Sequence, residues 1–145
     1  MKASTRSDTG SVLSLDVGER RIGVAVADLQ ARLPRPLTTL DNGSEVIEQI
    51  CNLITEHHAT VLVVGLPRGL DGQHTSQTGY VETFVKTLEP VVGVPTKWQD
   101  EALTSRKAEQ ELNSRGKPYS KGDIDALSAT YILEDFLHDH AEVQL

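Results

Sequence analysis

The stretch SVLSLDVGERRIGVAVAD, residues 11–28, contains two apolar runs joined by a short polar turn. The runs Val12–Val17 and Ile22–Ala27 are rich in valine, leucine and isoleucine, and the turn spans Gly18–Arg21. Strand-forming residues on both sides of a glycine-containing turn predict a β-hairpin.

Asp16 is the one charged residue inside these two runs. Side chains alternate between the faces of a strand, so Asp16 lies on the face opposite Leu13 and Leu15. Burying an ionised carboxylate costs roughly several kcal/mol unless a cation or fixed donors offset it. We therefore expect Asp16 to bind a cation, or, as a purely structural alternative, to accept hydrogen bonds from the amides of the turn that follows it.

Length and composition indicate one globular domain. The chain has 145 residues, of which 38% are hydrophobic and 24% charged, and no apolar run approaches the ~20 residues of a membrane span. The polar first residues lack the apolar segment of a secretory signal.

We expect a disordered lead at residues 1–10, a single domain at 11–138 and an acidic tail at 139–145. The single cysteine, Cys51, excludes an internal disulfide and suits a reducing cytoplasm.

Charge is unevenly distributed along the chain. The formal net charge is −7, which argues weakly against a nucleic-acid partner. Residues 97–121, however, contain six basic residues against four acidic ones, while the residues after Leu133 contain no lysine or arginine. The middle of the chain is locally basic, so the overall sign does not decide the partner.

Apolar periodicity and turn residues predict the remaining elements. Pro34 and Pro36 favour an edge position for a third strand, Ser44 is a candidate N-cap, and Ser120 with Asp123 matches a capping box. The expected elements are a strand at Leu33–Thr39, a helix at Glu45–His57, a strand at Thr60–Leu66, a helix around residues 81–88, a strand at Val94–Gln99, a helix from Thr104 or Ser105 to Arg115, and a helix from Ser120 to Leu137. An antiparallel start followed by βα units predicts an α/β fold with a mixed sheet and helices on its faces.

Three acidic residues stand where the pattern turns apolar: Asp16 ends the first strand, Glu101 follows the last, and Asp125 begins the apolar stripe of the last helix. Each has a structural alternative. Asp16 could bond to the amides of its turn, and Glu101 and Asp125 could be acids favoured where a helix begins. Together, however, carboxylates at strand ends and at the start of a packed helix can meet at one edge of a sheet. Their mutual repulsion is relieved by Mg²⁺ or Mn²⁺, which take oxygen ligands of this kind and support phosphoryl transfer.

Other candidates carry weaker signals. Arg20 and Arg21 follow Asp16 closely and have the donor geometry for a phosphate, although surface charge explains them equally well. His74 lies in a long polar loop that could reach a substrate, although an ordinary surface role is favoured. Trp98 and Tyr119 could stack on bases, with ordinary packing as the alternative.

Four motifs in order resemble the YqgF family: LDVGERRIGVAVAD at 15–28, VVGLPRGLDG at 63–72, WQDEALTSRKAEQEL at 98–112 and KGDIDALSATYIL at 121–133. The likeness extends over residues 12–137. Members of this family are associated with pre-16S ribosomal RNA maturation and were earlier described as Holliday-junction resolvase homologues. The resemblance implies a ribonuclease H-like fold with a five-stranded sheet whose first three strands are antiparallel.

The resemblance also implies a Mg²⁺- or Mn²⁺-dependent phosphodiesterase. The family's three acidic motifs fall on Asp16, Glu101 and Asp125, the residues selected above, as catalytic and metal-binding residues. The substrate-binding residues that we expect are Gly18, Arg20, Arg21, Arg106, Lys107 and Lys121. One position departs from the family pattern: Ala102 replaces the arginine that usually follows the glutamate. This departure predicts weaker activity unless Arg20, Arg21 or Arg106 substitutes.

Three classes of function remain open. We expect a cytoplasmic endonuclease acting on structured RNA in 5′-end maturation of pre-16S rRNA, as a monomer or weak homodimer without a membrane partner. A Holliday-junction resolvase would apply the same chemistry to branched DNA, and a ribosome-assembly module would bind nucleic acid without cleaving it. An Asp-x-Gly hairpin also begins the ATPase domains of the actin and sugar-kinase group, but those proteins need two such domains.

Overall fold

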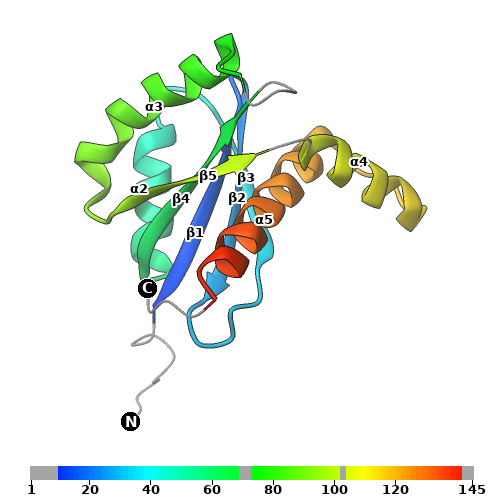
Figure 1. The fold of residues 1–145 in the computed structure, drawn as a ribbon, viewed down its shortest axis with the longest axis horizontal. Coiled ribbons are helices and arrows are strands. Elements are labelled where there is room, and N and C mark those ends of the chain that lie inside the picture. Colours follow the sequence, from blue (N-terminus) through cyan, green and yellow to red (C-terminus); the bar gives the residue numbers. More distant parts are fainter. Residues whose placement is uncertain (1–9, 69–72, 102–103, 142–145) are drawn as a thin grey trace.

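A computed structural model describes residues 10–68, 73–101 and 104–141, with the side chains of 104–106 excepted. A five-stranded sheet lies at its centre, in the order β3-β2-β1-β4-β5 (Figure 1). The strands are β1 (Ser11–Val17), β2 (Arg21–Asp28), β3 (Arg35–Asp41), β4 (Ala59–Pro67) and β5 (Thr96–Glu101).

The strand directions confirm the expected mixed sheet. β1 pairs antiparallel with β2, and β2 pairs antiparallel with β3. β4 lies parallel to β1 on its other side, and β5 lies parallel to β4. β1 is therefore the central strand, which explains why it is buried along almost its whole length.

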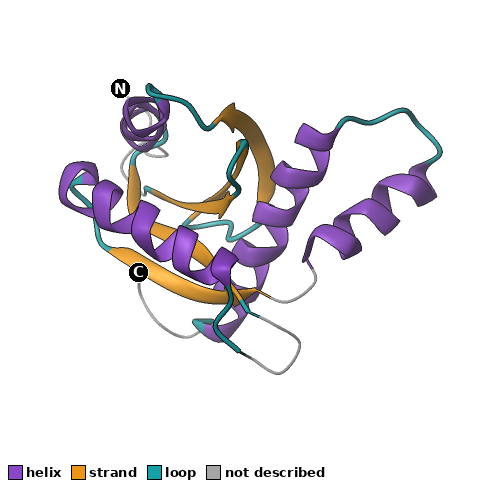
Figure 2. Ribbon diagram, turned by 90° about the horizontal axis from the view of Figure 1, so that it is seen from above, coloured by secondary structure: helices purple, strands orange, loops and turns teal. Residues whose placement is uncertain are grey.

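Helices cover both faces of the sheet (Figures 1 and 2). α2 (Val46–Glu56) and α3 (Ser76–Val92) lie on one face, and α5 (Lys121–Asp139) lies on the other. α4 (Thr104–Arg115) packs against α5 and projects away from the sheet. The alternation along β1 divides the core as expected: Leu13 and Leu15 pack with α2 and α3, whereas Val12 packs with α5.

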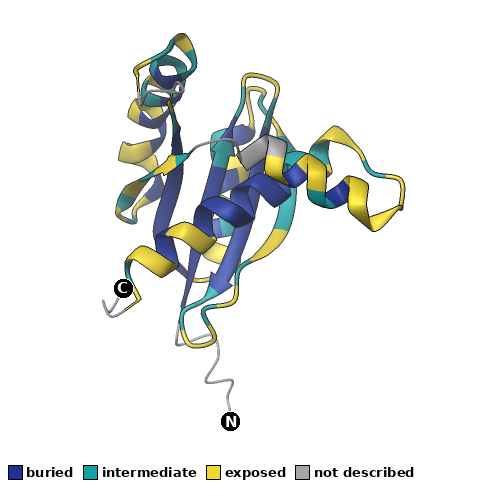
Figure 3. Ribbon diagram, turned by 45° about the vertical axis from the view of Figure 1, so that its right-hand side comes forward, coloured by how far each residue is buried: buried dark blue, intermediate teal, exposed yellow. Residues whose placement is uncertain are grey.

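α5 carries the apolar stripe that the sequence predicts. Ala129, Ile132 and Phe136 are at most 1% exposed and pack on the sheet, and Figure 3 shows the middle of this helix buried and its C-terminal end largely exposed. Ser120 caps the helix in a reciprocal capping box with Asp123, as predicted. The cap sets where α5 begins, and the stripe sets which side of the helix, with Asp125 in its first turns, meets the sheet.

Several local predictions differ from the structure. α3 is longer than expected, from Ser76 to Val92 rather than around residues 81–88. β3 is an edge strand, as its prolines suggest, but it runs to Asp41 because its pairing with β2 continues to the hairpin turn. Ser44 is not the N-cap of α2; Glu45 holds that position without a side-chain hydrogen bond. β5 extends to Glu101, which pairs in register with Pro67, so the acid lies on the strand rather than after it.

Several expectations fall on residues outside the described part of the chain. These are the disordered lead at residues 1–9, the end of the acidic tail at 142–145, and the substitution at Ala102. The rest of residues 139–145 closes α5, which ends at Asp139. Among the described helices, none combines the length and the apolar character needed to cross a bilayer.

Candidate active site

The three predicted carboxylates line one pocket at the edge of the sheet. Its volume is about 300 Å³, and it lies where β1, β4 and β5 end and α5 begins. The residues lining it are Asp16, Val17, Gly18, Pro67, Gln77, Glu101 and Asp125. Acids separated by more than a hundred positions in the sequence thus face a common space.

A glycine allows Asp125 to approach Asp16. Gly23 on β2 is the register partner of Asp16, and the backbone of α5 rests directly on it. A Cβ at this position would overlap the Asp125 carbonyl oxygen and lie 2.8 Å from the Ala126 amide nitrogen. Only glycine lets the first turns of the helix lie this close to the strand.

A second glycine makes room for Glu101. Gly65 follows Val64, the residue of β4 that pairs with Leu15 of β1, so it lies beside Asp16 on the other side. A Cβ at Gly65 would lie 2.9 Å from Oε2 of Glu101 and would overlap the Ile132 side chain. Asp16 is therefore flanked across the sheet by two residues without side chains, and the space they leave holds the site.

Burial dominates the electrostatics of the pocket. It raises the pKa of Asp16 well above its usual range, and repulsion by Glu101, a hydrogen bond shared with Glu101 and repulsion by Asp125 raise this pKa further. Asp16 retains partial exposure, whereas Leu15 is fully buried and Val17 is 3% exposed. The Asp16 carboxylate lies at the wall of the pocket.

Asp125 has a cationic partner. Nε of Arg21 donates a hydrogen bond to Oδ2 of Asp125 at 2.6 Å, and the two side chains are 32% and 21% exposed. Arg21 begins β2, and its carbonyl oxygen accepts a hydrogen bond from the Gly18 amide across the turn. The guanidinium that the sequence suggested for a phosphate is thus held by a carboxylate of the site.

The other predicted substrate-binding residues lie on three parts of the chain: the turn between β1 and β2, α4, and the start of α5. Gly18 lines the pocket, and its carbonyl oxygen accepts a hydrogen bond from Nδ2 of the Asn42 side chain. Arg20 is exposed in the turn, and Lys121 is exposed at the first turn of α5. Lys107 lies away from the carboxylates, with its ammonium 4.4 Å from the centre of the Tyr131 ring. The side chain of Arg106 falls outside the described residues.

Sequence analysis missed three residues that shape the pocket: Gly23, Gly65 and Gln77. Each glycine interrupts an apolar run, and an isolated glycine within a strand signals close approach of another backbone. Gln77, in the first turn of α3, donates a hydrogen bond from Nε2 to the Val17 carbonyl at 3.3 Å. No sequence pattern distinguishes this glutamine from the other polar residues of its segment.

The carboxylates fit a hard divalent cation in their chemistry. Three carboxylate side chains in one pocket, one of them buried at an electrostatic cost, form the oxygen-rich donor set that Mg²⁺ and Mn²⁺ prefer. As the side chains lie, no group of three or more His, Cys, Asp or Glu among the described residues is arranged around an ion. Asp125 is paired with Arg21 instead. The three carboxylates therefore share a pocket, but their side chains are not arranged as metal ligands.

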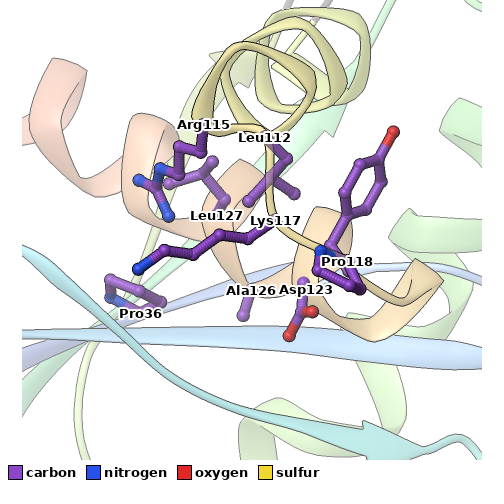
Figure 4. Close-up of a pocket in the computed structure, with 9 residues that line it drawn as sticks. Pro36, Leu112, Arg115, Lys117, Pro118, Asp123, Ala126 and Leu127 are labelled. Carbon is purple, nitrogen blue, oxygen red and sulfur yellow. The ribbon is translucent and has the colours of Figure 1, made fainter.

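A second pocket lies between α4, α5 and β3 (Figure 4). Its floor is apolar, formed in part by Leu112 and Leu127, while Arg115 and Lys117 extend over it. Its volume is about 280 Å³, and it contains none of the three predicted carboxylates. Its two cations lie on the basic segment that the sequence indicated, although Arg115 is paired with Glu111.

Residues 10–139 match the family model described as RuvX, Holliday junction resolvase. The chain belongs to the RuvX family. This is the family called YqgF above, so the resemblance is confirmed. The matched region includes all three carboxylates and every strand and helix described.

Curated RuvX relatives match almost end to end. One from Chloroflexus aggregans is 44% identical over 131 residues, covering 88% of this chain and 92% of the relative. One from Crocosphaera subtropica is 40% identical, with the same coverage of both chains. Both bear the name "Putative pre-16S rRNA nuclease".

Solved structures of low sequence identity share the fold. Thermus thermophilus RuvC in complex with a Holliday junction substrate has a TM-score of 0.53 at 15% identity, covering 89% of this chain and 95% of its own. The fowlpox virus resolvase in complex with Holliday junction DNA has a TM-score of 0.53 at 12% identity, with 91% and 99% coverage. The ribonuclease H-like fold expected for this RuvX chain is thereby confirmed.

Proposed function

We propose that this protein is a metal-dependent endonuclease that hydrolyses phosphodiester bonds in structured RNA. One observation carries the proposal: carboxylates from β1, β5 and α5 line a single pocket in a chain of the RuvX family. Such a donor set supports in-line displacement at phosphorus, because a bound divalent cation activates water and stabilises the departing oxygen.

The residues of the chain have distinct roles in this proposal. Asp16, Glu101 and Asp125 would hold Mg²⁺ or Mn²⁺. Asp16 contributes most to the demand for a cation, since its carboxylate is buried next to that of Glu101. Gly18 lines the pocket beside the carboxylates, and a Cβ there would lie 2.8 Å from the Arg21 carbonyl oxygen, so that glycine keeps this turn tight next to the proposed substrate path.

Basic residues outside the pocket would bind the backbone of the substrate. Arg20 and Lys121 are exposed next to elements that form the site. Arg106 and Lys107 belong to α4, the helix that projects from the body of the protein. Contacts of this kind position a nucleic acid without reading its sequence.

The substrate that we propose is pre-16S rRNA, cleaved during maturation of its 5′ end. This assignment follows the name of the curated relatives, which cover nearly the whole chain at about 40% identity. We further propose that it acts in the cytoplasm, where ribosomal RNA precursors occur, as a monomer or weak homodimer.

Cleavage assays with purified protein test the proposal. We expect Mn²⁺-dependent cutting of a pre-16S RNA fragment by the wild type, and loss of cutting in Asp16→Asn, Glu101→Gln and Asp125→Asn. A four-way DNA junction is offered separately. Symmetric nicking of the junction without RNA cleavage would replace the proposal by a Holliday-junction resolvase, the activity in the family's description and the substrate in the RuvC and fowlpox complexes.

A non-catalytic nucleic-acid-binding module for ribosome assembly is the second alternative. It is favoured by Ala102, which stands where the family has an arginine beside the glutamate. Arg21 is our preferred substitute among the candidates with described side chains, because its guanidinium is paired with Asp125. If Asp16→Asn changed neither cleavage nor binding of Mn²⁺, this alternative would replace the nuclease.

A further inference from the structure

Arg21 and Asp125 form an ion pair at the pocket of the three carboxylates. The Nε–Oδ2 distance of 2.6 Å is that of a charge-assisted hydrogen bond. The two side chains are 32% and 21% exposed, so water and ions reach the pair. An ion pair in this position is weak enough to open, because partial exposure screens its attraction.

The pair is not needed to attach α5 to the sheet. Ser14 donates a hydrogen bond to the Ala129 carbonyl, and Thr39 donates one to the Gly122 carbonyl, each at 2.6 Å. The apolar stripe of α5 and the close approach at Gly23 fix the same helix independently. The backbone that carries Asp125 is therefore held in place whether or not its carboxylate is paired.

Two cations compete for this carboxylate if the proposed metal site is correct. Asp16 and Glu101 already share a hydrogen bond within the pocket, and Asp125 faces them from α5. Oδ2 of Asp125 accepts a hydrogen bond from Arg21, and the same oxygen would have to turn to an ion bound between the three acids. In the structure the Asp125 carboxylate is bound to Arg21.

Resting on the proposed function, we propose that Arg21 is a positioning residue that holds Asp125 in the metal-free protein and is displaced from it by the divalent cation. The guanidinium released from the carboxylate has the planar donor pattern that a phosphodiester oxygen accepts. Metal binding thereby makes Arg21 available to the substrate at the pocket, in a chain that has Ala102 at the family's arginine position.

Calorimetric titration of the chelator-treated protein with Mn²⁺ tests the competition without any cleavage. Arg21→Gln is compared with Arg20→Gln. This control removes the same charge from the neighbouring residue, whose side chain is exposed. We expect Arg21→Gln to bind Mn²⁺ about two- to fivefold more tightly than Arg20→Gln, the fold-change that corresponds to a partly exposed ion pair. Equal affinities, or weaker binding by Arg21→Gln, would overturn the inference.

A measurement on the wild type removes any dependence on how the variants fold. The Nε–H resonance of Arg21, assigned by comparison with Arg21→Lys, is followed by ¹⁵N NMR during titration with Mg²⁺. We expect this resonance to shift and to exchange faster with water as the ion pair opens, and a resonance unchanged at saturating Mg²⁺ would overturn the inference. A wild type that binds neither ion would instead contradict the proposed function.

Discussion

Asp16 joins the proposed chemistry to the stability of the protein. Burial raises its pKa above the ordinary value of 3.8, so the folded chain retains a proton that the unfolded chain releases. Stability from this group is therefore greatest below the ordinary pKa and is lost as pH rises through the raised pKa of the folded state. The residue that we expect to matter most for activity is one that the fold tolerates at a cost.

Asp16→Asn should accordingly stabilise the metal-free protein at pH 8, by about 1 kcal/mol, the usual scale for relief of strain at a functional site. The gain should shrink as the pH falls towards 4, where both proteins are neutral at this position. Urea unfolding in the presence of a chelator at several pH values measures the difference. A variant that is less stable than the wild type at pH 8 would contradict this account of Asp16.

The three acids could be selected from the sequence because each interrupts or begins an apolar pattern. A charge in such a place needs a partner, and that requirement is visible without coordinates. The partner itself is not visible: nothing in the sequence indicates that Arg21 binds Asp125 rather than a phosphate. Long-range side-chain pairing depends on how α5 meets β2, which only the packed structure determines.

At the scale of elements, glycines control how closely α5 and β5 approach the central strand. The contact at Gly23 involves backbone atoms of α5, which cannot rotate away from an added methyl group. The contact at Gly65 involves the flexible ends of Glu101 and Ile132. The two positions should therefore differ in their tolerance of a larger residue.

Gly23→Ala should destabilise the protein by about 2 kcal/mol or more, because the helix must move away from the strand to admit the methyl group. Chemical unfolding provides the measurement. Gly43→Ala is the matched control, since nothing lies within 4 Å of the added atom there, and its effect should stay within about 0.5 kcal/mol. Comparable losses in the two variants would refute the close approach at Gly23.

α4 is fastened to α5 through a small polar and apolar contact. Ala108 and Leu112 pack on Leu127 and Tyr131, and the Tyr131 hydroxyl donates a hydrogen bond to Glu111. Burial and this bond raise the pKa of Tyr131, while the same bond lowers the pKa of Glu111. The hydroxyl is thus the polar link of the interface.

Tyr131→Phe should cost about 1 kcal/mol, the usual net value of a side-chain hydrogen bond, while keeping the ring beneath Lys107. The pKa of Glu111 should also rise towards its ordinary value of 4.5. Unfolding and carboxyl NMR titration measure the two effects. An unchanged Glu111 titration would show that the hydroxyl does not bind this carboxylate in solution.

The sequence predicts the elements well where periodicity and caps are strong, as at Ser120 and along α5. It fails at boundaries that pairing decides. β5 reaches Glu101 because its ladder with β4 continues to Pro67, and no property of residues 100 and 101 taken alone indicates a strand. Ser44 has the right chemistry for an N-cap, but the helix begins one residue later than that cap requires.

On the scale of the whole molecule, net charge and local charge oppose each other. The chain carries −7 overall, yet exposed lysines lie near the proposed entrance for nucleic acid and beside the pocket between α4, α5 and β3. Binding to a polyanion then depends on a few local contacts, and each of them contributes to the dependence of affinity on salt.

Lys117→Gln and Lys121→Gln should each weaken RNA binding and reduce the slope of log affinity against log salt by about one. Lys86→Gln, on α3 across the sheet, carries the same charge change and should leave the slope unaltered. Fluorescence anisotropy with a chelator present, which prevents cleavage, gives the slopes. Identical slopes for all three variants would place the nucleic acid elsewhere on the protein.

The central claim is that Asp16, Glu101 and Asp125 converge on one divalent cation. Anomalous diffraction from crystals soaked in Mn²⁺ tests it most directly, because the manganese signal locates the ion independently of the protein model. The account predicts a peak in the pocket within about 2.0–2.3 Å of oxygens from all three carboxylates, with Arg21 no longer bound to Asp125. A peak elsewhere, or an ion that contacts only one of the three acids, would contradict it.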